Sequence, residues 1–215
     1  GVSADARPVV VPERGCVLLY IDLSQIEAAI AGAVFRIPGL VEATIQGDVY
    51  AAVARRIFAD DLDANDLTLS DGDFKAKHPE KRAVAKICLL ARIYGSSEGG
   101  LVSNLAAAGF SARAAAIVER FASFFPELAE ATGSSGEFSA RRGYAIAATG
   151  LRRHRGKKGP VEAWEVRGLI NFSVQATAAA LFKVAGNRLH RLLSRFGAKI
   201  VVPLHDAFIQ SDPVQ

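Results

Sequence analysis

The chain has 215 residues, 50% of them hydrophobic, and a formal net charge of +4. This length allows one large domain or two small ones with a real hydrophobic core. The mild basic excess permits a nucleic-acid partner without requiring one. No signal peptide is visible, and no apolar run approaches the roughly 20 residues of a membrane span, so neither secretion nor membrane insertion is expected.

Two smaller features concern compartment and completeness. Cys16 and Cys88 lie far apart in apolar runs, which favours reduced, buried cysteines and a cytoplasmic protein. The sequence contains no methionine and begins with Gly1. We therefore expect a piece of a longer protein.

The elements, taken in chain order, are a strand, a long helical block and a final pair of strands. Residues 17–23 (VLLYIDL) predict a buried strand, and Ser24 with Glu27 fits the capping box that starts a helix. The helix that starts at this capping box is expected to stop near Pro38-Gly39. Further helices are expected at residues 41–58, 81–94, 112–131 and 170–196, the fourth of the five interrupted near Pro126. We expect a loop at 59–79, broken chain at Gly95 and at Gly99-Gly100, a hairpin or tip within 143–166, and a strand–turn–strand at 199–210. This order predicts an α+β fold rather than an alternating one.

Two aspartates stand at the ends of strand-like runs. Asp22 ends the first run, and Asp206 lies between the last two. Either residue by itself is commonly a cap or turn aspartate. Together, two strand-end carboxylates could hold hard divalent cations such as Mg²⁺, and two such ions can activate an attacking oxygen and stabilise a leaving one.

A cationic pair marks the helix at 81–94. Arg82 and Lys86 are four residues apart on the face opposite Val84 and Cys88. This face could simply be solvated, or it could bind a polyphosphate, with Arg making forked contacts and Lys acting as a point charge. Tyr94 follows near the same side.

Two further polar groups could contact nucleic acid. The basic stretch 152–158 is either a solvated loop or a set of phosphate contacts. On the last helix Arg167, Asn171 and Gln175 form a line with a spacing of four residues, which either faces solvent or reaches DNA. The core face predicted for this helix consists of Val174, Ala178, Leu181, Ala185, Leu189 and Leu192.

The constellation resembles the family A (DNA polymerase I type) DNA polymerases, as a divergent, phage-like member. Residues 22–27 (DLSQIE) resemble motif A of that family, Arg82, Lys86 and Tyr94-Gly95 resemble motif B, and residues 204–206 (LHD) resemble motif C. The segments 143–153 and 167–179 resemble family segments in the same order. The resemblance covers nearly the whole chain.

The resemblance implies a role for each matching residue. Asp22 and Asp206 would be catalytic, and together with Leu23 they would hold two Mg²⁺ ions. Arg82 and Lys86 would grip the incoming triphosphate. Glu27 would be the steric gate against a ribose 2′-OH, packed against Tyr94, and Gln25 and Leu90 would line the nucleotide site. The implied contacts to DNA come from Arg152, Arg153, Arg167, Asn171, Gln175 and His205.

The resemblance also implies an architecture and partners. It assigns residues 1–36 to the first part of an antiparallel-sheet palm, 37–142 to a mostly helical fingers subdomain with the motif B helix at 81–95, and 143–215 to the second part of the palm. The thumb is absent from this chain. The implied activity is template-directed transfer of dNMP to a primer 3′-OH. Primer-template DNA, dNTPs and other replication or repair proteins are the expected partners, and no membrane is.

The sequence departs from the family pattern at several positions. Ala207 stands where motif C usually has Glu, and Leu90 stands where an aromatic usually stacks on the nucleotide. Two alternatives therefore stay open: a single-subunit phage-type RNA polymerase, which lacks the Gln-Ile-Glu after the first Asp, and a catalytically decayed polymerase fold retained as a DNA-binding subunit.

Overall fold

The computed structural model describes residues 9–204 and 207–213 of the protein. By its internal contacts the chain divides into two compact units. The first, which we call the sheet unit, comprises residues 1–26 and 178–215. The second, the helical unit, comprises residues 27–177.

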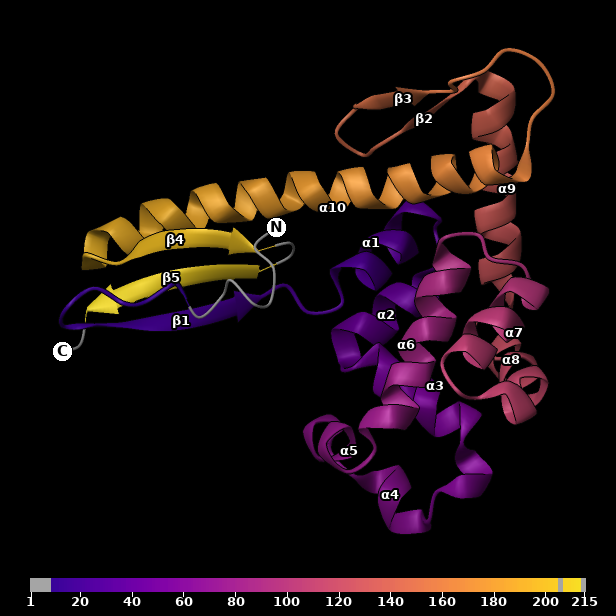
Figure 1. Ribbon diagram of the computed structural model, residues 1–215, viewed down its shortest axis with the longest axis horizontal. Helices are drawn as coiled ribbons and strands as arrows, with labels where there is room; N and C mark the ends of the chain where they lie inside the picture. Colours follow the sequence, from indigo (N-terminus) through magenta and orange to yellow (C-terminus); the bar gives the residue numbers. More distant parts are fainter. Residues whose placement is uncertain (1–8, 205–206, 214–215) are drawn as a thin grey trace. The chain divides into compact units, whose positions relative to one another are not determined.

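The sheet unit is built on a three-stranded antiparallel sheet. Its strands are β1 (Cys16–Asp22), β4 (Lys199–Leu204) and β5 (Ala207–Pro213), in the order β1-β5-β4 (Figure 1). β1 pairs with β5 from Cys16 opposite Pro213 to Asp22 opposite Ala207. The two strands predicted at the end of the chain are confirmed, because β4 and β5 pair antiparallel; the residues between them, 205–206, lie outside the described residues. The prediction of a buried first strand is wrong, because β1 pairs on one side only and its Leu19 and Tyr20 are exposed.

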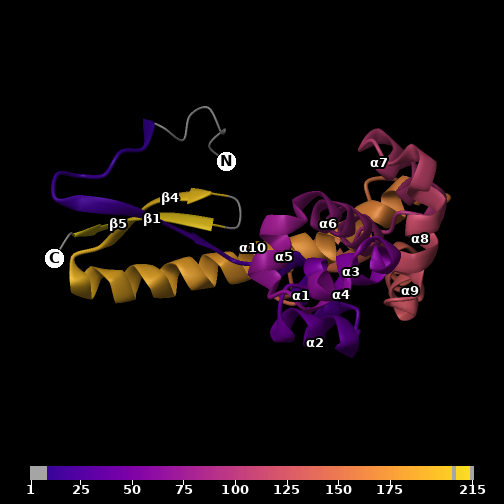
Figure 2. The same ribbon diagram turned by 90° about the horizontal axis from the view of Figure 1, so that it is seen from below.

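The second half of α10 (Ala163–Leu193) runs along one face of this sheet, as Figures 1 and 2 both show. Phe182 stacks on Phe208 of β5 with ring centroids 4.1 Å apart. A Cβ at Gly186 would lie 2.8 Å from the Phe208 ring, so only glycine lets the helix approach this closely. The predicted core face is wrong in this half of the helix. Leu181 and Leu192 are exposed, since the face that meets the sheet carries Phe182 and Gly186.

The helical unit consists of short helices, a two-stranded hairpin and the first half of α10. Its hairpin strands are β2 (Tyr144–Ile146) and β3 (Arg152–His154), which confirms the hairpin predicted in this region. The α-helices are α1 (Ile26–Val34), α2 (Pro38–Gln46), α3 (Val49–Ile57), α4 (Ala64–Thr68), α5 (Asp71–Lys77), α6 (Pro79–Ile93), α7 (Glu98–Ala107), α8 (Ala114–Ala122) and α9 (Pro126–Arg142). Short 3₁₀ turns are η2 (Ala59–Asp61) and η3 (Ser111–Arg113), and η4 (Ser194–Phe196) follows α10 in the sheet unit.

Local sequence signals explain where these helices begin. Pro38, Pro79 and Pro126 stand in the first turn of α2, α6 and α9, where the missing N–H of proline costs nothing. A second set of helices starts at a side chain that accepts a hydrogen bond from the first turn: Asp48 for α3, Asp63 for α4, Ser70 for α5 and Ser97 for α7. Each such cap is worth roughly 0.5–2 kcal/mol.

These caps account for three predictions that were wrong. Residues 59–79 are not a loop but hold η2, α4 and α5, because Asp63 and Ser70 cap helices inside an acidic stretch. The helix predicted at 41–58 is two helices, divided at Gly47 and the Asp48 cap. Gly99 and Gly100 do not break the chain but lie in the first turn of α7, downstream of the Ser97 cap.

The core of the helical unit forms around α6, which contacts α3, α5, α7, α8 and α9. The buried side of α6 carries Val84, Ala85, Cys88, Leu89 and Ile93. A Cβ at Gly136 of α9 would lie 2.7 Å from side-chain atoms of Val166 and Ile170 on α10, so α9 and the start of α10 are in very close contact.

α10 and the two cysteines bear on the expectations that the chain does not enter a membrane and that its cysteines are reduced and buried. With the turn to Phe196, α10 is long and apolar enough to cross a membrane by length and composition alone. One such helix is weak evidence of a membrane span, so the expectation of no membrane insertion stays a prediction. Both cysteines are free, as predicted; Cys88 is buried, and burial raises the pKa of its thiol to about 12, whereas Cys16 is half-buried.

Candidate active site

Asp22 is the last residue of β1, and its side chain is exposed. Its Cα partner across the sheet is Ala207, the first residue of β5, which is fully buried. Leu23 follows and is half-buried. The other predicted metal ligand, Asp206, and its neighbour His205 lie outside the described residues. Within residues 9–204 and 207–213, no group of three or more His, Cys, Asp or Glu side chains could hold a metal ion.

Arg82 and Lys86 lie one helical turn apart on α6, on a side that packs against α3. Both cations lie over the ring of Tyr50, which is on α3: the Arg82 guanidinium carbon is 5.1 Å and the Lys86 Nζ 5.7 Å from the ring centroid. Cation–π contacts of this kind attract each cation by roughly 0.5–2 kcal/mol. Lys86 is exposed and Arg82 half-buried. The structure thus brings the two predicted phosphate-binding side chains to one place.

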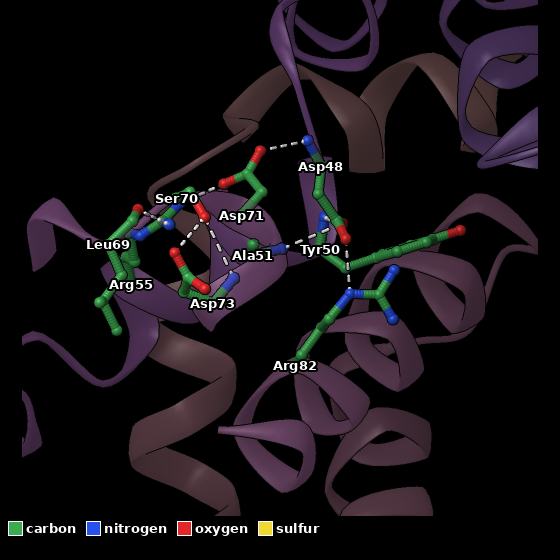
Figure 3. Close-up of polar contacts among 9 residues, drawn as sticks. All are labelled: Asp48, Tyr50, Ala51, Arg55, Leu69, Ser70, Asp71, Asp73 and Arg82. Carbon is green, nitrogen blue, oxygen red and sulfur yellow. Dashed lines mark hydrogen bonds and ion pairs between the residues drawn. The ribbon is translucent and has the colours of Figure 1, made fainter. Parts of the chain in front are cut away.

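Arg82 is also held by an ion pair. Its Nε donates a hydrogen bond to Oδ2 of Asp48 at 2.6 Å (Figure 3). Both side chains are mostly buried, with 20% exposure for Arg82 and 16% for Asp48. Neither Asp48 nor Tyr50 was among the predicted site residues. Gly47-Asp48 ahead of an apolar run signals a helix start, but nothing in the sequence pairs that aspartate with Arg82, 34 positions later.

Glu27 and Tyr94 are joined by a hydrogen bond in which the Tyr94 hydroxyl donates to the Glu27 carboxylate. Gln175 of α10 also hydrogen-bonds with Tyr94. Burial, followed by the bond to Glu27, raises the pKa of Tyr94. The capping-box prediction is wrong, because Gln25 has φ +58° and α1 therefore begins only at Ile26. Glu27 is thus in the first turn of α1, with its carboxylate directed at Tyr94.

Leu90 lies one turn before Tyr94 on α6 and is half-buried, whereas Leu89 beside it is completely buried. Tyr94 itself caps the C-terminal end of α6, with its N–H bonded to the Leu90 carbonyl at 3.0 Å. Glu27, Arg82, Lys86, Leu90 and Tyr94 all belong to the helical unit, whereas Asp22 and Gln25 belong to the sheet unit.

Some basic side chains of residues 152–158 are exposed, whereas Arg155 binds other groups of the chain. Arg152 and Arg153 on β3 are exposed, and Arg152 lies over the Tyr144 ring at 4.9 Å. Arg155 is engaged instead: it forms an ion pair with the buried Glu165 at 3.1 Å and donates to the carbonyls of Gly159 and Pro160. Arg152 and Arg153 therefore remain the candidates for phosphate contact in β3.

The three polar residues that form a line on α10 differ in their exposure. Arg167 and Gln175 are exposed, whereas Asn171 is half-buried and its Oδ1 is buried without a hydrogen-bond partner in the described part of the chain. An open cavity of about 410 Å³ lies between α6, the segment that follows it, α9 and α10, and its lining includes Arg92, Gly95 and Arg167. Arg167 thus faces a hollow of the helical unit.

The chain is similar to known proteins of one family. A model of the family "DNA polymerase family A" matches residues 2–213. DNA polymerase I of Chloroflexus aurantiacus is 29% identical over 215 residues, which cover 97% of this chain and 21% of that protein. The thermostable DNA polymerase I of Thermus aquaticus is 27% identical over 212 residues, which cover 96% of this chain and 24% of that protein.

The fold is likewise similar to a solved structure. It is that of the POL domain of Pol1 from M. smegmatis in complex with DNA primer-template and dNTP, with a TM-score of 0.73 and 23% identity, over 94% of this chain and 35% of that one. The α+β fold class predicted from the sequence agrees with this likeness. The chain spans about a fifth to a quarter of the length of the curated relatives it matches.

Proposed function

Because the chain belongs to DNA polymerase family A, we propose that it is the palm-and-fingers part of a template-directed DNA polymerase. The full-length protein would transfer a deoxynucleotide from a dNTP to a primer 3′-OH. Residues 1–36 and 143–215 would form the palm and 37–142 the fingers, with the thumb outside this chain. Primer-template DNA, dNTPs and other replication or repair proteins would be its partners in the cytoplasm, away from membranes.

The observation that carries this proposal is the cationic face of α6. Arg82 and Lys86 are one helical turn apart and converge on the ring of Tyr50. A planar guanidinium offers forked donors to phosphate oxygens, and an ammonium adds a compact charge beside it. Two different cations held one turn apart suit a chain of phosphates better than a single anion.

The catalytic carboxylates would come from the sheet. Asp22 ends β1 opposite Ala207, and Asp206 directly precedes Ala207 in the sequence. An exposed carboxylate at a strand end is the type of oxygen ligand that Mg²⁺ prefers. We assign Asp22, Asp206 and the Leu23 carbonyl to two Mg²⁺ ions, which when bound would activate the primer 3′-OH and stabilise the leaving pyrophosphate.

The chain's own residues would select and orient the substrates. Arg82 and Lys86 would hold the triphosphate, so that its α-phosphate meets the primer end in a fixed geometry. Gln25 and Leu90 would line the nucleotide pocket. Glu27, fixed by the Tyr94 hydroxyl, would exclude a 2′-OH. Contacts to the primer-template are assigned to Arg152, Arg153, Arg167, Asn171, Gln175 and His205; the M. smegmatis POL domain was solved with such a DNA.

Primer extension by the full-length protein tests the proposal. Wild-type protein with Mg²⁺ should extend a DNA primer with dNTPs, and Asp22→Asn should lower kcat by roughly a thousandfold or more, because a neutral amide holds Mg²⁺ poorly. Asp212→Asn is the matched control. Asp212 lies on β5 opposite Val17, at the other end of β1, and its carboxylate accepts a hydrogen bond from Gln210.

The outcomes separate the alternatives. No extension by wild-type protein with either sugar, together with intact DNA binding, would establish a decayed polymerase fold. Extension with rNTPs in preference to dNTPs would make the protein an RNA polymerase. Equal loss of activity in Asp22→Asn and Asp212→Asn would show that the sheet, and not the carboxylate at position 22, is what the reaction requires.

A further inference from the structure

Asp48 holds two groups at once at the start of α3. Its Oδ1 accepts the backbone N–H groups of Tyr50 at 2.9 Å and Ala51 at 3.2 Å, which caps the helix. Its Oδ2 accepts Arg82 Nε at 2.6 Å (Figure 3). An ordinary N-cap needs only the first of these contacts. The second links the cap of α3 to a cation of α6.

Asp48 is itself held in place by α5. Its backbone N–H donates to Oδ2 of Asp71 at 2.7 Å, and Oδ1 of Asp71 forms an ion pair with Arg55 at 2.7 Å. Arg55 also donates to the Leu69 carbonyl at 2.8 Å. A Cβ at Gly47 would lie 2.4 Å from Asp71 Oδ2, so this approach requires glycine at position 47. The Asp48 carboxylate that faces Arg82 is therefore held by contacts with both α3 and α5.

The ion pair uses one edge of the Arg82 guanidinium. Asp48 faces Nε, and Nη1 and Nη2 lie on the far side of the group (Figure 3). The ring of Tyr50 supports the guanidinium at 5.1 Å. A free arginine side chain loses rotamer entropy when it is fixed. Asp48 and Tyr50 impose that loss before any ligand arrives, which strengthens subsequent binding.

We propose that Asp48 is a positioning residue for the nucleoside triphosphate site: it holds the guanidinium of Arg82 so that the Nη edge is presented to the phosphates. This inference rests on the proposed function, because it takes the Arg82 face as the triphosphate site. Asp48 does not touch the substrate; it acts through Arg82. The Asp71–Arg55 pair and Gly47 extend the same support to α5.

The alternative role for Asp48 is to compete with the phosphates for Arg82. A carboxylate that only occupied Arg82 in the absence of nucleotide would act in this way, and its removal would tighten dNTP binding. A positioning carboxylate has the reverse effect, since its removal lets Arg82 adopt many rotamers. The sign of the change in KM therefore decides between the two.

The test compares two N-cap aspartates in the full-length protein. Asp48→Ser keeps a capping oxygen but removes the charge and the reach to Arg82. Asp63→Ser is the matched control, because Asp63 caps α4 through the Asp66 N–H at 2.7 Å and is not part of the Arg82 network. In primer extension we expect Asp48→Ser to raise the dNTP KM about tenfold with kcat within about twofold of wild type. Asp63→Ser should leave both parameters unchanged.

Two further variants keep the proposal falsifiable if Asp48→Ser folds poorly. Asp48→Asn keeps one oxygen for the cap but places an NH2 group, which can only donate, in front of Nε, so it should raise the dNTP KM as Asp48→Ser does while preserving the cap. In an Arg82→Ala background, Asp48→Ser should have no additional effect on KM, because the residue it positions is gone. An unchanged or lower KM in folded Asp48→Ser, or full additivity with Arg82→Ala, would overturn the inference. Lack of extension by wild-type protein would instead defeat the proposed function.

Discussion

The Tyr94 hydroxyl donates a hydrogen bond to the Glu27 carboxylate, which connects the C-terminal end of α6 to the first turn of α1. The two residues are 67 positions apart in the sequence. Because Gln25 has a left-handed backbone, Glu27 is not engaged as a capping-box partner. The bond fixes the direction of the Glu27 carboxylate. A group that excludes one sugar by steric contact has to be fixed in this way.

The first prediction concerns sugar selectivity. Glu27→Ala should raise ribonucleotide relative to deoxyribonucleotide incorporation, since the wall that meets a 2′-OH becomes shorter. We expect the ratio of kcat/KM for dNTP over rNTP to fall at least about tenfold, as single contacts commonly contribute 1–3 kcal/mol to discrimination. Tyr94→Phe keeps the ring but removes the hydroxyl, so it should lower the ratio by less. A ratio that does not move in Glu27→Ala would remove Glu27 from the nucleotide site.

The second prediction concerns the cation one turn beyond Arg82. Lys86→Ala should lower kcat/KM for dNTPs by roughly a hundredfold, because a charged contact to the triphosphate is lost. Lys183→Ala, at an exposed lysine of α10, should leave kcat/KM unchanged. The measurement is steady-state primer extension by the full-length protein. Equal values for wild type and Lys86→Ala would mean that this face of α6 is only solvated.

The sequence predicted the elements that carry strong local signals. The strand ending at Asp22, the helix carrying Arg82 and Lys86, and the hairpin at β2 and β3 were all predicted. Apolar patterning predicts the strand and the helix, because it follows from which face is buried, whereas turn residues indicated the hairpin. The short capped helices α4 and α5 were missed, since their acidic composition concealed the Asp63 and Ser70 caps.

The contacts that hold Asp48 and Arg82 in place could not be predicted from the sequence. The contacts of Asp48 with Arg82 and of Asp71 with the Asp48 N–H join α3, α5 and α6. Such contacts depend on how helices pack, and no spacing within one helix encodes them. The same holds for the face of α10 that meets the sheet, where Gly186 allows Phe208 to approach. A helical pattern alone selected Leu181 as a core residue, although it is exposed.

The third prediction concerns acid stability of the α4–α5 region. Asp66 is buried and accepts a hydrogen bond from Lys77, which with His78 lowers the Asp66 pKa to about 2. Burial alone would raise the pKa of Asp71, but bonds from the Asp48 N–H and Arg55 leave it below its ordinary value. A depressed carboxyl pKa contributes stability that is present above about pH 4 and lost as the pH falls toward 2.

Thermal unfolding measured between pH 6 and pH 2 should therefore show a steep decrease in Tm below about pH 4. Asp66→Asn should be less stable than wild type at pH 6 and should lose less Tm on acidification. Asp73→Asn is the matched control, because Asp73 is exposed and accepts a hydrogen bond from the Ser70 hydroxyl. The same acid-induced loss in Asp66→Asn and wild type would assign the pH dependence to other carboxylates.

The last prediction concerns DNA binding by the hairpin. Arg152 and Arg153 are exposed on β3, whereas Arg155 is committed to Glu165. Each arginine that contacts a phosphate releases counterions, so affinity for DNA falls linearly with salt on a logarithmic scale. Changing both residues to alanine should reduce that slope by about 1.4–1.8, at roughly 0.7–0.9 for each lost contact. Arg113→Ala with Arg120→Ala removes the same charge from residues paired with Asp61 and Asp60 and should leave the slope nearly unchanged. The quantity to measure is primer-template affinity across a salt titration. Equal slopes for both double variants would mean that overall charge, and not the hairpin, determines the salt dependence.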